Sequence, residues 1–209
     1  MPRLIRFGTS GWRALIAEGF TVASVRRVAA AIASHLIDSG SARRGIYVGY
    51  DTRFMSDRFA REAASVLAGR GIPVALSPAP VPTPAVAVAI VAGRRAGGLN
   101  ITASHNPPEW SGIKFSMASG APAPPEITRA LEAILDADPE GASAAGGPAS
   151  PAGRPAKISL VDARAAYFRQ LGGLVRLRTI RKARLAVACD PRHGASIGYL
   201  DGIFSKAAR

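Results

Sequence analysis

The sequence Leu-Asn-Ile-Thr-Ala-Ser-His-Asn-Pro-Pro-Glu-Trp-Ser-Gly-Ile-Lys-Phe, which begins at residue 99, constrains the fold more than any other stretch. Its first three residues follow two glycines and form a short apolar run, which is typical of a buried strand. The strand has to end soon afterwards, because Pro107 and Pro108 lack backbone N–H groups and push the residues before them towards extended geometry. The sequence therefore predicts a stiff loop that carries Ser104, followed by a second short strand over residues 112–117.

Ser104 is followed directly by His105, and Lys114 lies in the second of these strands. A serine hydroxyl on such a loop can carry or attack a phosphoryl group, while a histidine and a lysine supply proton transfer and positive charge. An ordinary polar turn, in which serine and asparagine side chains hydrogen-bond their own backbone, accounts for the same residues without any chemistry. Phosphate chemistry and a polar turn are therefore open alternatives at this point.

Two other segments also allow either a role at a functional site or an ordinary local structure. Residues 7–13, Phe-Gly-Thr-Ser-Gly-Trp-Arg, permit a backbone that approaches a phosphate closely, and Arg13 offers donors matched to phosphate oxygens. A plain glycine-rich turn is the alternative. Asp51 and Arg53 follow a predicted strand, where they form either a local salt bridge or turn, or a support for a nearby site.

Strand-like and helix-like patterns alternate along the chain as far as Ser104. The helices are predicted from apolar residues at helical spacing, and the strands from short apolar runs bounded by glycine or proline. The predicted strands cover residues 3–10, 45–51, 72–76 and 99–101, and the predicted helices cover residues 21–40, 57–70 and 84–91. This order is typical of a layered α/β domain, whose catalytic groups gather where strands meet loops.

The composition changes after a further helix predicted over residues 124–136. Residues 138–156 consist mostly of Ala, Gly, Pro and Ser, which predicts a flexible linker or a surface loop. We therefore divide the chain into a first domain over residues 1–137, the linker, and an incomplete second domain over residues 157–209.

Within the incomplete second domain, residues 158–171 have the pattern of a helix, and residues 184–190 that of a buried strand. The single cysteine, Cys189, lies in this apolar run and is expected to be a buried structural thiol. His193 follows in a loop, where we expect it to have a structural role.

The chain has a net charge of +13, and most of the excess is C-terminal: residues 151–209 contain 12 Lys and Arg against 3 Asp and Glu. No basic patch with interleaved aromatic residues, zinc-ligand spacing or RNA-binding signature accompanies it, so we expect no nucleic-acid partner. No apolar stretch approaches the length of a membrane span, and the N-terminus lacks a signal-peptide core. These features predict a cytoplasmic protein with no membrane partner.

The motif Thr-Ala-Ser-His-Asn-Pro, followed by Gly-Ile-Lys, closely resembles the active-site loop of the α-D-phosphohexomutase superfamily, the phosphoglucomutases and phosphomannomutases. The Ser-Gly-Trp-Arg segment is similar to the opening motif of that superfamily, and the Asp51 segment to a further motif near its active site. The resemblance implies a three-layer α/β/α domain with a mixed sheet, followed by part of a second α/β domain. It implies that Ser104 carries the phosphoryl group.

The resemblance also assigns roles to the residues around the serine. Arg13 and Lys114 would stabilise the phosphoryl group, His105 and Lys114 are candidates for general acid/base assistance, and Asn106 would hold the loop. The residues that would bind substrate or phosphate are Ser10, Arg13, Asn106 and Lys114. The implied activity interconverts hexose 1-phosphate and hexose 6-phosphate through a phosphoserine and a bisphosphate intermediate, with glucose 1,6-bisphosphate as activator and a phosphohexose as substrate.

The resemblance covers the whole chain, yet the chain is less than half of such a mutase. Mg²⁺ would be bound by the phosphate on Ser104 and by three aspartates of an Asp-Gly-Asp-x-Asp-Arg loop, and this loop is absent from the sequence. An alternative is therefore a catalytically silent fragment that folds as the first domain and binds at most a phosphosugar or a complementary chain. We expect the segment after residue 157 to be marginally stable and to expose apolar side chains, among them Leu185, Val187, Ile197, Leu200 and Phe204.

Overall fold

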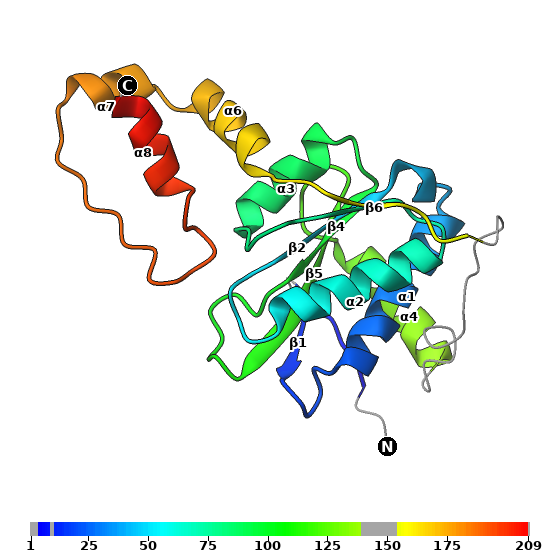
Figure 1. The fold of residues 1–209 in the computed structure, drawn as a ribbon. Coiled ribbons are helices and arrows are strands. Elements are labelled where there is room, and N and C mark those ends of the chain that lie inside the picture. Colours follow the sequence, from blue (N-terminus) through cyan, green and yellow to red (C-terminus); the bar gives the residue numbers. More distant parts are fainter. Residues whose placement is uncertain (1–3, 9–10, 139–153, 209) are drawn as a thin grey trace.

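The computed structural model describes residues 4–8, 11–138 and 154–208, which form a six-stranded mixed sheet with helices on both faces (Figure 1). The strand order is β1-β5-β4-β2-β3-β6. The strands are β1 Trp12–Leu15, β2 Ile46–Tyr50, β3 Val74–Leu76, β4 Gly97–Ile101, β5 Trp110–Met117 and β6 Ile158–Leu160. The helices are α1 Val22–Asp38, α2 Ser56–Gly69, α3 Thr83–Ala92, α4 Pro125–Ala137, α6 Arg164–Leu174, α7 Leu177–Lys182 and α8 Leu200–Ala208, with a 3-10 helix, η1, at Ala42–Arg44.

The sheet pairing determines where the loops lie. β2 is parallel to β3 and β4, and β3 is parallel to β6, whereas β5 is antiparallel to both β4 and β1. The loops that follow β2 and β4 therefore leave the sheet at the same edge. The predicted three-layer α/β/α arrangement with a mixed sheet is confirmed.

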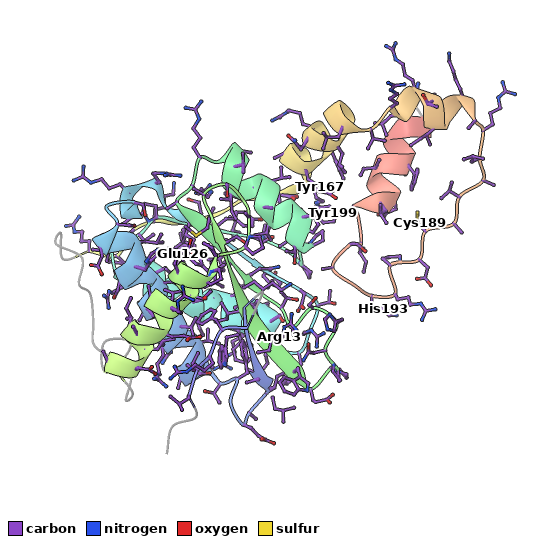
Figure 2. The ribbon with its side chains drawn as sticks, turned by 180° about the vertical axis from the view of Figure 1, so that it is seen from behind. Arg13, Glu126, Tyr167, Cys189, His193 and Tyr199 are labelled. Carbon is purple, nitrogen blue, oxygen red and sulfur yellow. The ribbon has the colours of Figure 1, made fainter. Side chains whose placement is uncertain are left out.

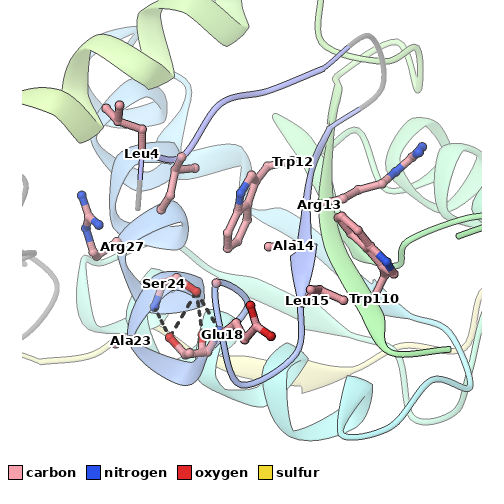
Figure 3. A pocket seen from close by; sticks show the side chains of 13 residues that line it. Leu4, Trp12, Arg13, Ala14, Leu15, Glu18, Ala23, Ser24, Arg27 and Trp110 are labelled. Atoms are coloured by element: carbon pink, nitrogen blue, oxygen red, sulfur yellow. Dashed lines mark hydrogen bonds between the residues drawn. The ribbon is translucent and has the colours of Figure 1, made fainter. Parts of the chain in front are cut away.

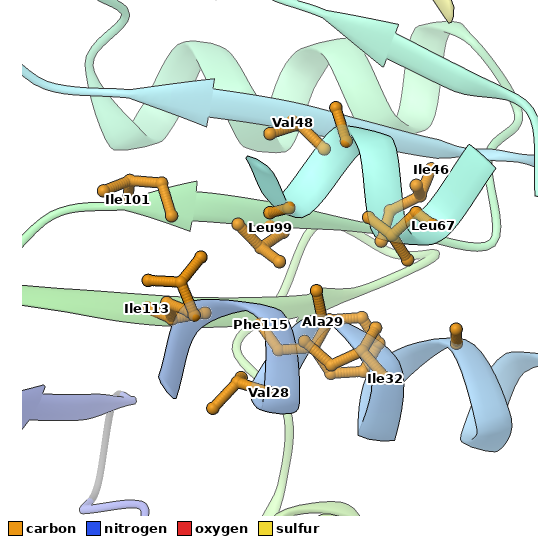
Figure 4. Close-up of a cluster of buried hydrophobic side chains, with 14 of the residues drawn as sticks. Val28, Ala29, Ile32, Ile46, Val48, Leu67, Leu99, Ile101, Ile113 and Phe115 are labelled. Atoms are coloured by element: carbon orange, nitrogen blue, oxygen red, sulfur yellow. The ribbon is translucent and has the colours of Figure 1, made fainter. Parts of the chain in front are cut away.

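The two faces of the sheet bury separate apolar clusters. Leu99 and Ile101 of β4 point to the face covered by α1, α2 and α4, where they pack with Ile32, Leu67 and Ile113 (Figure 4). The other face is covered by α3 and α6 and has a smaller cluster around Tyr47 and Ile90. Side chains alternate between the faces along a strand, so the residues between Leu99 and Ile101 and after Ile101 point towards α3.

The N-terminal strand predicted over residues 3–10 is wrong for residues 4–8, which form no strand, and residues 3, 9 and 10 lie outside the described residues. The first strand of the described part is β1, which begins at Trp12. The backbones of Gly8 and Gly11 hydrogen-bond to each other just before β1. Gly11 has φ of +128°, and a Cβ there would collide with the carbonyl oxygen of Ile113 on β5, so this approach requires glycine.

The helix predicted over residues 158–171 is wrong at its start. Ile158–Leu160 form β6, which pairs in parallel with β3, and helix α6 begins only at Arg164. Asp162 separates the two elements, because its carboxylate accepts a hydrogen bond from the backbone N–H of Arg164 at 2.9 Å. The predicted linker overlaps residues 139–153, which lie outside the described residues.

The buried strand predicted over residues 184–190 is also wrong. This segment has no regular structure and pairs with no strand in the described part of the chain. Leu185 is 68% exposed and Val187 51% exposed, and Cys189 is exposed rather than buried (Figure 2). An apolar run becomes a strand only beside another strand, since its backbone N–H and C=O groups need partners.

Aromatic side chains of α6 and Tyr199 join the apolar cluster around Tyr47, whereas α7 and α8 stand away from the sheet (Figure 1). Tyr167 of α6 packs edge-on against Tyr199, with ring centroids 5.6 Å apart (Figure 2). The hydroxyl of Tyr47 on β2 donates to the carbonyl oxygen of Val161 at 3.1 Å. Ile197 and Leu200 are exposed and Phe204 is partly buried, so most of the expected apolar exposure is found. No helix in the described residues is both long and apolar enough to cross a membrane.

Gly112 on β5 is a point of close packing that a larger residue should disrupt. A Cβ there would lie 2.6 Å from the carbonyl oxygen of Trp12 and 2.7 Å from that of Thr102, both backbone atoms. We expect Gly112→Ala to lower the free energy of unfolding by about 1–3 kcal/mol, measured by urea denaturation, because neither strand can yield easily.

Gly69→Ala is the matched control, because no atom lies within 4 Å of the position of its Cβ. Alanine in this helix should stabilise the protein by roughly 0.5–1 kcal/mol. Equal stabilities of Gly112→Ala and the unmodified protein would contradict the close packing at β5.

Candidate phosphoryl-transfer site

Ser104 lies on the loop between β4 and β5, here called the serine loop (residues 102–109). Three backbone hydrogen bonds shape it: the N–H of Thr102 donates to Gly112 at 2.9 Å, that of Asn106 to Ala103 at 3.2 Å, and that of Trp110 to Pro107 at 3.1 Å. The serine loop therefore begins and ends on the sheet, and its backbone turns tightly between these two ends.

Ser104 has a backbone conformation that serine rarely adopts. Its φ is +60°, in the left-handed region, which costs a residue other than glycine about 1–3 kcal/mol. The N–H of Ser104 donates to the hydroxyl oxygen of Thr102 at 3.0 Å, and this bond helps to hold the conformation. Ser104 and His105 are both exposed, and His105 makes no hydrogen bond to a described residue.

Strand register brings the predicted cationic residues to one face of the sheet. Arg13 pairs with Gly112, and Lys114 pairs with Asn100. Directly paired residues of antiparallel strands point to the same face, as do residues two apart on a strand. Arg13, Lys114, Asn100 and Thr102 therefore all point to the face that α3 covers.

Arg13 reaches the serine loop across Gly112. A Cβ on Gly112 would lie 3.0 Å from Cγ of Arg13, so the missing side chain leaves room for the arginine. The Arg13 guanidinium donates to the side-chain oxygen of Asn106 at 3.0 Å. Figure 3 shows Arg13 and Trp12 on opposite sides of β1. The structure thus brings Arg13 and Asn106 into contact, as predicted for residues of one site.

Lys114 lies in a positively charged environment. Burial, and next to it the charge of Arg13, lowers the pKa of the Lys114 ammonium. Lys114 has no acidic partner among the described residues. An ammonium that is partly desolvated beside another cation favours the binding of an anion.

A pocket of about 640 Å³ opens beside the serine loop. Its wall includes Ser104 and Asn106, and loop residues Gly194 and Ala195 approach it from the C-terminal part of the chain. The neighbouring His193 is exposed and does not line the pocket. Arg13 lines a different pocket, of about 460 Å³, together with Trp12, Glu18, Arg27 and Trp110 (Figure 3).

The loop after β2 contains the predicted local salt bridge and also borders the pocket. Asp51 and Arg53 form a local ion pair, with 3.2 Å between Oδ2 and Nε. Both residues also line the pocket, and Arg53 hydrogen-bonds to the serine loop. The two alternatives are therefore compatible. Ser10, predicted to bind phosphate, lies outside the described residues.

Asn100 is a site residue that the sequence reasoning missed. It is only 3% exposed, its amide nitrogen donates to the hydroxyl oxygen of Thr83 at 3.0 Å, and it lines the pocket. Its side-chain oxygen accepts no hydrogen bond from the described residues. The signal was an asparagine within an apolar strand, where a buried polar group costs free energy unless it is paired.

The described residues do not fit a magnesium site by themselves. No group of three or more His, Cys, Asp or Glu side chains gathers in the described part of the chain. The carboxylate in the pocket, Asp51, already accepts hydrogen bonds from Ser56 at 2.8 Å and from the Arg53 backbone at 3.0 Å. Mg²⁺ prefers several oxygen ligands in octahedral geometry, which this set does not supply.

Comparison with known proteins connects this geometry to a family. The family described as "Phosphoglucomutase/phosphomannomutase, alpha/beta/alpha domain I" matches residues 4–142. A phosphoglucomutase of Komagataeibacter xylinus is 28% identical over 97% of this chain and 38% of its own length. A phosphoglucomutase of Staphylococcus saprophyticus is 32% identical over 64% of this chain and 24% of its own length.

A solved structure also resembles this chain. The crystal structure of a putative phosphomannomutase from Thermus thermophilus superposes with a TM-score of 0.76 and 40% identity, covering 87% of this chain and 38% of that one. The chain thus spans well under half the length of these relatives. The matched residues 4–142 include the whole serine loop, Arg13 and Lys114. The chain therefore belongs to the phosphoglucomutase/phosphomannomutase family through its alpha/beta/alpha domain I.

Proposed function

We propose that Ser104 carries a phosphoryl group in the interconversion of hexose 1-phosphate and hexose 6-phosphate. The observation that carries the proposal is the pair of cations, Arg13 and Lys114, on the sheet face next to the serine loop, where Lys114 has no acidic partner among the described residues. Phosphoryl transfer depends mainly on positioning and on stabilising charge that is spread over phosphate oxygens.

In the proposed step, Oγ of Ser104 attacks a phosphorus atom of a hexose bisphosphate. The new bond joins Oγ to phosphorus, the bond between phosphorus and the sugar oxygen breaks, and the serine proton passes to that sugar oxygen. His105 and Lys114 are the proposed groups for this proton transfer. Arg13 stabilises the phosphate oxygens, and Asn106, which accepts a hydrogen bond from Arg13, fixes the guanidinium in place. Ser10 is proposed as a further phosphate ligand.

A second candidate function is that of a catalytically silent protein, which binds phosphosugar or is phosphorylated but does not convert substrate repeatedly. The lack of a magnesium ligand set among the described residues favours it. Multiple turnovers with Mg²⁺ and glucose 1,6-bisphosphate by this chain alone would exclude it, whereas activity that appears only with a complementary chain would support it.

We expect the protein to gain one phosphoryl group on incubation with glucose 1,6-bisphosphate, and Ser104→Ala to gain none. Alanine removes the nucleophilic oxygen and leaves the exposed position otherwise unchanged. Intact-mass spectrometry measures the product. Ser119→Ala, which alters another exposed serine, is the control and should be phosphorylated normally. Phosphorylation of Ser104→Ala would contradict the proposed role.

We expect Lys114→Met to weaken anion binding and to stabilise the folded chain. The pKa of Lys114 is lower in the folded chain than its ordinary value of 10.5, so the unfolded chain binds more protons between the two values. The stability of the unmodified protein should therefore rise with pH through that window, and this rise should be absent from Lys114→Met. At neutral pH the variant should be the more stable of the two.

Inorganic phosphate should raise the melting temperature of the unmodified protein more than that of Lys114→Met, because a ligand stabilises only the folded state that binds it. Differential scanning calorimetry with and without phosphate measures both effects. Lys157→Met, at an exposed position, is the control and should respond to phosphate like the unmodified protein. An equal response of Lys114→Met would remove Lys114 from the proposed anion site.

A further inference from the structure

The Arg53 side chain binds three backbone carbonyl oxygens of the serine loop and that of Trp110, the first residue of β5. Its Nη1 donates to the carbonyl oxygens of Pro107 at 2.7 Å and Trp110 at 3.0 Å. Its Nη2 donates to the carbonyl oxygens of Ser104 at 3.0 Å and Asn106 at 2.6 Å. One guanidinium therefore draws together carbonyl groups from both ends of the turn that carries the serine.

Asp51 fixes the guanidinium in this position. Nε of Arg53 lies 3.2 Å from Oδ2 of the Asp51 carboxylate, and the two side chains form an ion pair. The other carboxylate oxygen accepts hydrogen bonds from the backbone N–H of Arg53 at 3.0 Å and from the hydroxyl of Ser56 at 2.8 Å. The two Nη atoms thus each donate two hydrogen bonds to carbonyl oxygens, Nε forms an ion pair with Asp51, and both side chains of that ion pair are largely buried.

This arrangement directs Arg53 to the loop rather than to a phosphate. Its positive charge is offset by Asp51, and both of its Nη atoms donate to backbone carbonyl oxygens. Arg13 differs, because its guanidinium contacts a side chain of the loop, Asn106, and lies on the face of the charged Lys114. The two arginines next to the serine loop thus have separate tasks.

Both backbone groups of Ser104 are held by side chains. The N–H donates to Thr102 and the carbonyl oxygen accepts from Arg53, on either side of a residue with φ of +60°. A serine persists in the left-handed region only where its surroundings determine the conformation. The direction of the Ser104 side chain depends on this backbone conformation, so the same two bonds aim its hydroxyl.

We propose that Arg53, held by Asp51 and assisted by Thr102, is the positioning residue that keeps Ser104 in its left-handed, reactive conformation. The inference rests on the proposed role of Ser104 as the phosphoryl carrier. A loss of Arg53 then slows transfer to Ser104 without weakening the binding of the phosphate donor, because the Arg53 guanidinium is engaged by backbone carbonyl oxygens and by Asp51.

Arg53→Lys and Arg44→Lys form a matched pair of variants. Arg44 also donates to loop carbonyl oxygens, of Arg95 at 2.8 Å and Arg94 at 3.3 Å, but at the opposite edge of the sheet. Lysine retains the charge in both variants and loses the planar set of donors. The measurement is the rate of Ser104 phosphorylation by glucose 1,6-bisphosphate in the whole chain, followed by intact mass over a range of donor concentrations.

Arg53→Lys should lower the maximal rate by roughly 10²-fold, the order expected for a nucleophile misplaced by about 1 Å. The half-saturating donor concentration and the rate of Arg44→Lys should remain within about twofold of the unmodified protein. Equal maximal rates for the two lysine variants would overturn the proposal. So would a change confined to the half-saturating concentration, which would make Arg53 a donor-binding group.

Thr102 gives a second test if Arg53→Lys does not fold. Thr102→Val removes the acceptor of the Ser104 N–H and should slow phosphorylation, whereas Thr102→Ser retains the hydroxyl and should restore it. Equal rates for Thr102→Val and Thr102→Ser would count against the proposal.

Hydrogen exchange separates this inference from the proposed function. If the unmodified protein is not phosphorylated, the proposed role of Ser104 fails, and the amides of residues 102–110 then decide the question of positioning. Faster exchange there in Arg53→Lys than in Arg44→Lys would support the positioning of the serine loop by Arg53. Equal exchange would overturn it.

Discussion

The antiparallel pairing of β4 with β5 is the constraint on which the site depends. It joins two neighbouring strands by a short loop, and its register brings Lys114 opposite Asn100 and Gly112 beside Thr102. The absence of a side chain at Gly112 then allows Arg13 to cross from β1 to the serine loop. A shift of one residue in this register would turn Lys114 to the opposite face of the sheet.

The site combines several features that work against stability. Ser104 is left-handed, Lys114 is a partly buried cation beside Arg13, and the side-chain oxygen of Asn100 has no partner among the described residues. Each feature is unfavourable in a folded chain without ligand, and each is suited to binding an anion or presenting a nucleophile. The apolar cluster beneath α1 and α2 supports them, because it fixes the strands from which these residues project.

Patterns of neighbouring residues in the sequence predicted the serine loop and most helices. They did not predict contacts between segments that lie far apart in the sequence. Two consecutive prolines end a strand because they lack backbone N–H groups, so Pro107 and Pro108 allowed the loop to be predicted from sequence. The bonds from Arg53 to the loop depend on β2 and β4 being neighbours, which a pattern of apolar residues does not reveal. The run at residues 184–190 has a strand-like composition, but no strand pairs with it in the described part of the chain. Ile158–Leu160 is too short for its period to distinguish strand from helix.

The short strand β6 has a consequence for how the chain behaves when it is divided. β6 occupies the outer edge of β3, and its three residues come from beyond the alanine- and glycine-rich stretch. A chain cut within that stretch would leave the backbone of β3 open on one side, as a template for strands of other molecules. β6 therefore replaces β3 as the open edge of the sheet with a strand of only three residues, supplied to the first part of the chain by the second.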